Sequence, residues 1–409
     1  MRQKASSLAR LPGNCVNSAA HSCRNWRGRC RSGSHATGMI PATVISAILL
    51  VAYGYLVSLP PATGLGYVGL VAVTAGGTAL CRFGRALALY TGASWCVAWS
   101  AYASGTPVAV SVLAQFAYVV LMAAPAALPG RWWMRGLVQI LAPSVPPLAY
   151  WLPLPPLAGA GWIFPGAGAF GVAAFVALAL AVGRASGAAA ERTPAPRRQA
   201  ALVLAAVALV HIGGRLMIPV PGAPAGWEAW SISSAEAPPL SLEEAVGVEI
   251  SLARRLTTEK AVAVIAPENV LGTLPLAGMR LLKETLRPGQ EMLVGGIQVE
   301  HGRRWKGAWV LPHGYFVRAV APIPLIEPYG AEYSRVGETV MLQRTPASLL
   351  VCFEASTSMP LFHLHAGVPV ILIANGWWDT AGALDIQEAI AGSWARVFGL
   401  PLITSAVRP

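Results

Sequence analysis

The residues best suited to chemistry stand at the ends of two apolar runs. Cys352 follows "LLV" in the segment 349–354, "LLVCFE", and is followed by an aromatic residue and Glu354. An earlier run, 261–268 ("AVAVIAPE"), ends on Glu268. A strand that delivers a thiol to the rim of a sheet, with a carboxylate from another strand end, builds an activated nucleophile. Taken singly, the thiol also fits a packed core position and the carboxylate a surface charge.

Composition favours a membrane protein over a soluble one. Of 409 residues, 55% are hydrophobic and only 12% are charged, which is too apolar for an ordinary soluble chain. Residues 1–215 hold 16 Lys and Arg and one acid, a net charge of +15, and the remainder carries −3. A basic face is typical of nucleic-acid binding. Here the charges lie mainly between apolar runs, where membrane topology explains them, so we expect no direct nucleic-acid binding.

The apolar runs predict about seven membrane-spanning helices. Each has roughly the 20 apolar residues that cross a bilayer, and the connections between runs alternate between arginine-bearing and uncharged. By the positive-inside rule the N-terminus is cytoplasmic, and an odd number of spans puts the C-terminal part outside. We therefore expect a multi-pass protein of the bacterial inner membrane with a periplasmic C-terminal domain. The runs begin near Ile40, Leu65, Ala86, Pro107, Gly136, Gly161 and Gln199.

Three segments follow from these patterns: a basic segment 1–38, a transmembrane region 39–219 and an outer domain 220–409. The first segment lacks the continuous apolar stretch of a signal peptide, and translation from Met39 would make it dispensable. Its three cysteines do not have the short C-x-x-C spacing of zinc sites. His363 and His365 would point to different faces of a helix. We expect no metal and no cofactor.

The outer domain alternates strand and helix patterns. The helix 241–259 has Ser241 as its predicted N-cap, with Glu244 placed as in a capping box. The helix 383–399 ends at Gly399, a plausible position just past its C-terminus. Many strands with few helices predict an α/β layered fold with a mixed sheet. The expected strands are 227–233, 261–268, 291–299, 305–312, 315–322, 339–344, 347–355, 368–375 and 400–406.

These segments also carry a family resemblance. "VIAPENVLG" (264–272) and "LLVCFE" resemble the glutamate and nucleophile motifs of the nitrilase, or carbon–nitrogen hydrolase, superfamily. The tail resembles the membrane-bound branch that contains apolipoprotein N-acyltransferase, and its wording is most similar to the TraB family of plasmid conjugal-transfer proteins. That family joins a multi-span membrane part to a nitrilase-like domain. The tail features fall on Asn375, Trp378, Gln387, Arg396, Gly399 and Pro401.

The resemblance implies roles for the candidate residues. Cys352 would be the nucleophile and Glu268 the general base, with a lysine stabilising the oxyanion. Of the chain's lysines, only Lys283 and Lys306 lie between that glutamate and cysteine. The family lysine usually stands farther along, near a proline, and Arg318 in "YFVRAVAPIP" occupies that neighbourhood. We therefore expect Arg318 in place of the lysine, with Lys306 as the alternative. Supporting roles are expected for Glu354, Asn375 and Trp378.

Three hypotheses remain from the sequence. The first is a TraB-like conjugal-transfer membrane protein whose periplasmic domain is an amidase or acyltransferase working through a thioester. The second keeps the location but makes the domain a non-catalytic scaffold of the mating apparatus, because the family lysine is missing from its usual place. The third is an apolipoprotein N-acyltransferase. The expected partners are the lipid bilayer and either conjugation machinery or a lipid or acylated substrate.

Overall fold

The computed structural model describes residues 46–52, 63–95, 98–99, 102, 106–145, 155–190, 221–233, 242–268, 270, 276–319, 339–376 and 382–408. The chain divides into a unit of Met1–Leu49 and a unit of Leu50–Pro409. All labelled elements below belong to the second unit, and statements about absence concern only the ranges above.

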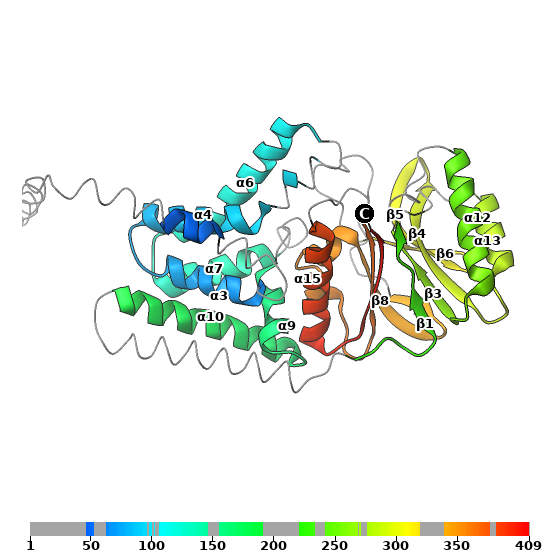
Figure 1. Ribbon diagram of the computed structural model, residues 1–409. Coiled ribbons are helices and arrows are strands. Elements are labelled where there is room, and N and C mark those ends of the chain that lie inside the picture. The colour runs from blue at the N-terminus through cyan, green and yellow to red at the C-terminus, as the bar shows by residue number, and fades with distance from the viewer. Residues whose placement is uncertain are drawn as a thin grey trace, which may run out of the picture. The chain divides into compact units, whose positions relative to one another are not determined.

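The N-terminal part of this unit is helical (Figure 1). Two of its helical segments are long and apolar enough to cross a membrane, Val108–Ala127 and Gly168–Ser186. Along α6, large apolar side chains are exposed at Val108, Val112, Leu113 and Phe116, as on a helix surrounded by lipid. The main helices are α3 (Thr63–Thr74), α4 (Ala79–Ala93), α6 (Val108–Ala127), α7 (Trp132–Leu141), α9 (Ala160–Ile163) and α10 (Gly168–Ala190).

The expected number of about seven spans is not reached within the described residues, where two helices qualify. The runs predicted from Leu65, Ala86 and Gly136 form shorter helices, α3, α4 and α7. Glycines follow α3, and Pro143 lies in the short 3₁₀ helix that follows α7. Neither residue type favours a continuing α-helix, which explains why these helices end early. The run from Gln199 lies outside the described residues.

Two buried arginines sit where helical segments of this part end. Arg82 donates from Nε to the carbonyl of Ala126 at 2.9 Å and from Nη1 to that of Gly77 at 2.5 Å. Arg135 donates to the carbonyls of Gly130 and Ala75. The last carbonyls of a helix lack intrahelical partners and form the negative end of its dipole. These arginines therefore satisfy backbone groups after α3 and around the end of α6.

The C-terminal part contains two five-stranded sheets, ordered β1-β3-β4-β5-β6 and β2-β10-β9-β8-β7. The first sheet holds β1 (Trp227–Ala229), β3 (Ala263–Ala266), β4 (Glu291–Glu300), β5 (Arg303–Leu311) and β6 (Tyr315–Arg318). The second holds β2 (Ile232–Ser233), β7 (Thr339–Leu342), β8 (Thr345–Val351), β9 (Val370–Asn375) and β10 (Leu402–Arg408). Both sheets mix parallel and antiparallel pairs.

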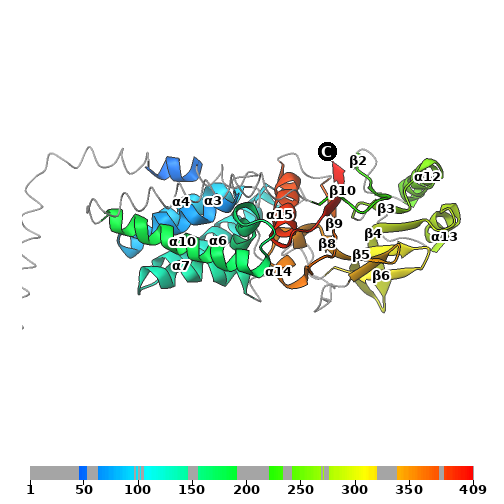
Figure 2. The ribbon, with the colours of Figure 1, turned by 90° about the horizontal axis from the view of Figure 1, so that it is seen from below.

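The sheets and helices stack in layers (Figures 1 and 2). Apolar side chains of both sheets, such as Ile265, Leu293 and Ile371, fill the space between them. Helices α12 (Leu242–Thr258) and α13 (Leu276–Thr285) pack on the outer side of the first sheet. Helix α15 (Ala383–Phe398) packs on the outer side of the second. Strands β3 and β9 are buried at every position, as expected for strands covered on both faces.

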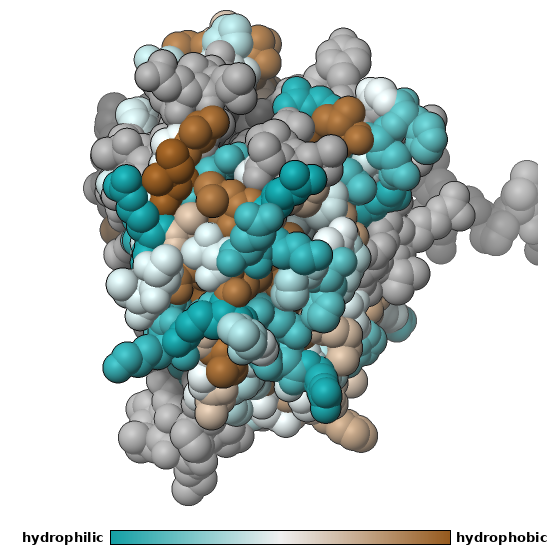
Figure 3. Space-filling view, turned by 90° about the vertical axis from the view of Figure 1, so that its right-hand side faces the viewer, coloured by the Kyte–Doolittle hydropathy of each residue, from teal (hydrophilic) through white to brown (hydrophobic). Residues whose placement is uncertain are grey.

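The side of the molecule formed by α12 and α13 is largely polar, with scattered apolar residues (Figure 3). Among its exposed apolar side chains are Val246, Ile250 and Leu281. This pattern agrees with an amphipathic helix layer that buries one stripe against the sheet.

The expected α/β layered domain is confirmed, with three corrections. The single mixed sheet is two sheets, because buried runs read alike from sequence whichever sheet they join. The predicted strand 227–233 is two strands, β1 and β2, one in each sheet. Helix α13 was not predicted. Helix α15 ends at Gly399 in the left-handed conformation, φ 65°, as predicted. The predicted cap Ser241 lies outside the described residues.

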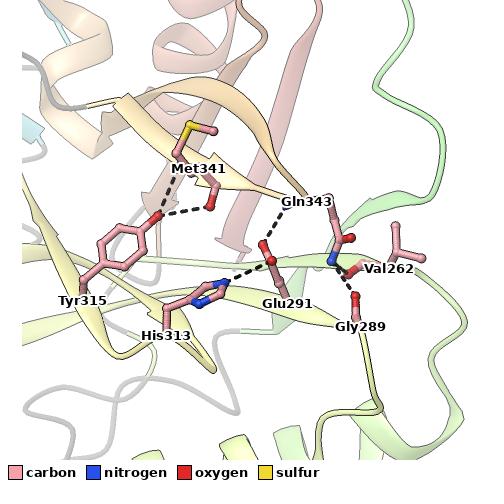
Figure 4. A network of polar contacts seen from close by, with 7 residues as sticks. All are labelled: Val262, Gly289, Glu291, His313, Tyr315, Met341 and Gln343. Carbon is pink, nitrogen blue, oxygen red and sulfur yellow. Dashed lines mark hydrogen bonds and ion pairs between the residues drawn. The ribbon is translucent and has the colours of Figure 1, made fainter.

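A polar network joins the two sheets at the start of β4 (Figure 4). The backbone N–H of Gln343, in the turn between β7 and β8, donates to Glu291 Oε2 at 2.7 Å. The Gln343 side chain donates to the carbonyls of Val262 and Gly289 at 3.0 and 2.6 Å. His313 lies 3.1 Å from Glu291 Oε1. Since β3 and β4 run parallel from this end, the network is at the opposite end of the strands from Glu268.

Candidate active site

Cys352 occupies a sharp turn at the end of β8. The strand ends at Val351 and a 3₁₀ helix covers Cys352–Ser356. Cys352 has φ 47°, a left-handed conformation that is costly for a residue other than glycine and is found at functional sites. The Glu354 carboxylate is buried and accepts the Val351 N–H at 2.7 Å. Glu354 therefore fixes the turn that presents the thiol.

A carboxylate and an ammonium group from the first sheet meet near this thiol. Glu268 follows β3 and is 3% exposed. Lys306 Nζ lies 3.4 Å from Glu268 Oε1. Lys306 lies on the same face of β5 as Ala308 and Val310, which belong to the core between the sheets. Residues from both sheets thus assemble one cluster at their carboxyl ends.

The surroundings disfavour ionisation of the thiol. Burial is the largest influence that raises the pKa of the Cys352 thiol above its ordinary value, and the Glu268 carboxylate raises it further. Lys306 and a backbone hydrogen bond from Asn375 oppose this rise. Desolvation and a neighbouring negative charge both disfavour a thiolate. Attack by this sulfur therefore needs a base that removes the proton during the reaction.

A side-chain amide completes the neighbourhood of the sulfur. Cys352 Sγ lies 3.9 Å from Oε1 and 4.0 Å from Nε2 of Gln387, on α15. Gln387 was recognised in the sequence only as part of the tail resemblance, with no role in the site. Its position five residues into the last helix carries no local signal of proximity to a thiol 35 residues away. Only the packing of α15 brings it there.

Arg318 is not at the thiol. Its Nη2 lies 2.5 Å from Glu300 Oε2, and its guanidinium stacks 3.9 Å above the Trp305 ring. In the β5–β6 pairing Arg318 is opposite Gly307. Directly opposed residues share a face of the sheet and sequence neighbours alternate, so Arg318 shares the face of Trp305 and Lys306 takes the other. The structure therefore places Lys306, the alternative considered from the sequence, beside Glu268, and it places Arg318 beside Glu300 and Trp305.

The remaining predicted residues have these positions. Asn375 is buried at the end of β9 and its backbone faces the Cys352 thiol. Trp378 lies outside the described residues. His363 is part of the short helix α14 (Pro360–His363), and burial lowers its pKa, with a further lowering from His365.

The solved structures similar to this chain include variants of one amidase. Part of the chain is similar in structure to an amidase from Nesterenkonia sp. AN1, of the nitrilase superfamily. One variant, bound to acrylamide, is 14% identical, with a TM-score of 0.35 over 46% of this chain and 79% of the amidase. In another variant, 15% identical with a TM-score of 0.33 and the same coverage, the acetamide moiety of fluoroacetamide is covalently attached to the active-site cysteine.

Comparison by sequence gives one curated relative. No family model matches the chain. The conjugal transfer protein TraB of Agrobacterium fabrum is 26% identical over 160 residues, which is 35% of this chain and 38% of TraB. The match therefore spans well under half of that relative. The similarity to TraB conjugal-transfer proteins that the sequence motifs predicted is confirmed over this stretch.

Proposed function

We propose that residues 220–409 form a nitrilase-like cysteine amidase or acyltransferase domain in a TraB-like conjugal-transfer membrane protein. The observation that carries the proposal is the strained, buried Cys352 next to the Glu268–Lys306 ion pair. A thiol, a general base and a cation within one cluster are the groups that acyl transfer through a thioester requires.

The geometry supports a two-step reaction. Glu268 takes the thiol proton as Cys352 Sγ bonds to the acyl carbon, and Lys306 stabilises the negative charge on the acyl oxygen. The carbon–nitrogen bond then breaks, Glu268 returns the proton to the leaving amine, and a thioester remains. In the second step, water or an amine attacks the thioester and gives a proton to Glu268. The bond from the acyl carbon to Sγ then breaks, and Glu268 passes this proton to the sulfur, which restores the thiol. Glu354 and the Asn375 backbone position the turn and the sulfur.

The proposal also places the two parts of the chain relative to the bacterial inner membrane. A relative that acts in conjugal transfer and two apolar helices of spanning length support membrane association. Residues 39–219 would cross the bacterial inner membrane with the N-terminus cytoplasmic, and residues 220–409 would lie in the periplasm. The lipid bilayer and conjugation machinery or an acylated substrate are the proposed partners. The proposed function involves no direct binding of nucleic acid.

The test replaces the nucleophile in a conjugative plasmid whose own copy of this gene is deleted. We expect Cys352→Ala and Cys352→Ser to reduce transfer frequency sharply at normal protein levels, because covalent catalysis loses its nucleophile. Cys81→Ser is the matched control, since Cys81 is an exposed free thiol outside the site. Unchanged transfer by both Cys352 variants would contradict the enzymatic function and favour the scaffold.

A further inference from the structure

A buried side-chain amide, that of Gln387, lies against the candidate nucleophile. Gln387 is 8% exposed. Its only hydrogen-bond contacts among the described residues are the two long ones with Cys352 Sγ, 3.9 Å from Oε1 and 4.0 Å from Nε2. Sulfur is a weak partner, so the described part of the chain leaves most of the hydrogen-bonding capacity of this amide unused. Buried amides are normally paired more fully than this, which indicates a group kept for a ligand.

The amide and the ion pair reach the sulfur from different layers. Glu268 and Lys306 come from the first sheet, whereas Gln387 comes from α15, on the outer side of the second sheet (Figure 1). An acyl group bonded to Sγ would lie beside the sulfur, next to the groups that contact it. Its oxygen can then receive a hydrogen bond from Lys306 and another from an uncharged donor.

We propose that Gln387 is a further catalytic residue, whose Nε2 donates a hydrogen bond to the acyl oxygen in the tetrahedral intermediate. This inference rests on the proposed function. An amide donor suits the position because it stabilises negative charge on oxygen without adding charge beside Glu268 and the thiol. A second cation there would compete for the carboxylate that must take the thiol proton. The substrate class is therefore one with an acyl oxygen, an amide or ester.

The role predicts different effects on two reactions of the same sulfur. Acylation by p-nitrophenyl acetate passes through a tetrahedral oxyanion, whereas alkylation by iodoacetamide displaces iodide and forms none. A donor to the oxyanion accelerates only the first reaction. A residue that merely packs around the thiol, or tunes its protonation, alters both.

The experiment measures both rates at Cys352 by intact mass on the full chain in detergent, with Cys352→Ala as background. Gln387→Met keeps the length of the side chain and removes its donor. We expect acylation to slow by about 10²–10³-fold and alkylation to stay within about twofold, the former being the usual loss when one oxyanion donor is removed. Glu388→Gln, a neighbour on α15 that pairs with Arg408, is the matched control and should leave both rates unchanged.

The outcomes separate this inference from the function on which it rests. Normal acylation of Gln387→Met, or an equal fall in both rates, would overturn the assignment of Gln387 while the wild-type acyl adduct upholds the enzyme. If the wild-type chain is alkylated but never acylated at Cys352, the proposed function itself fails. An alkylation rate equal to that of the wild type also shows that the variant keeps the fold around its thiol, because unfolding would expose the buried sulfur and speed alkylation.

Discussion

At the scale of single residues, the site depends on which cation faces the thiol. Cys352 and Glu268 could be predicted because each closes an apolar run, and strand ends gather at the rim of a sheet. The choice between Lys306 and Arg318 could not. It depends on the pairing of Gly307 with Arg318 across β5 and β6, and a shift by one residue would exchange the faces. Sequence spacing contains no record of that register.

The first prediction compares these two cations. Lys306→Met should slow acylation of Cys352 by about 10²–10³-fold, because it removes a charged donor from the developing oxyanion. Arg318→Met should leave that rate within a few-fold, since the guanidinium contacts Glu300 and Trp305. Single-turnover acylation of the purified chain measures both. The reverse order would restore Arg318 as the functional cation.

The second prediction concerns the pH dependence of the thiol. Glu268 raises the Cys352 pKa and Lys306 lowers it, so Glu268→Gln should lower this pKa, because the carboxylate is removed and the positive charge of Lys306 remains. At a given pH more of the thiol is then ionised, and the alkylation profile moves to lower pH. Acyl transfer should nevertheless fall, because the base is lost. Iodoacetamide alkylation across pH, beside acylation at one pH, checks this. A profile moved to higher pH would contradict the assigned environment.

At the scale of elements, the site requires two sheets in fixed relation, because Glu268 and Lys306 lie on one and Cys352 on the other. Most strands, α12 and α15 could be predicted from apolar runs and amphipathic periodicity. The division into two sheets could not, since strand partners are set by long-range packing. The network at Glu291 and Gln343 is equally invisible in sequence, because it joins four separate segments.

The third prediction tests the network between the sheets. Gln343→Ala removes two side-chain hydrogen bonds that hold the β7–β8 turn against the first sheet. Loss of such bonds should lower the free energy of unfolding by about 1–3 kcal/mol, measured by thermal or denaturant unfolding. Arg344→Ala is the matched control, because Arg344 is exposed, lies in the same turn and shares its positive φ. Equal effects of the two variants would show that the turn, and not the network, determines stability.

At the scale of the whole molecule, an apolar helical region and an α/β domain share one chain. Composition and arginine placement indicated the membrane region, and Arg82 and Arg135 prove to satisfy carbonyls where helices end. The number of spans could not be fixed by counting apolar runs, because glycine and proline interrupt several of them.

The fourth prediction addresses topology. A reporter fused after Pro409 should show periplasmic activity, as alkaline phosphatase does, because the proposed odd number of spans places the C-terminal domain outside. A fluorescent reporter that matures only in the cytoplasm should stay dark at the same position. The opposite result would place the candidate active site on the cytoplasmic side and remove the periplasmic substrate from the proposal.

The central claim is that Cys352 forms an acyl-enzyme, and intact mass analysis of the full chain after brief reaction with p-nitrophenyl acetate tests it most directly. The account predicts one acetyl adduct that maps to Cys352, appears with wild-type protein and is absent from Cys352→Ala. A wild-type chain without that adduct, or a Cys352→Ala chain that acquires it at the same rate, would contradict the account.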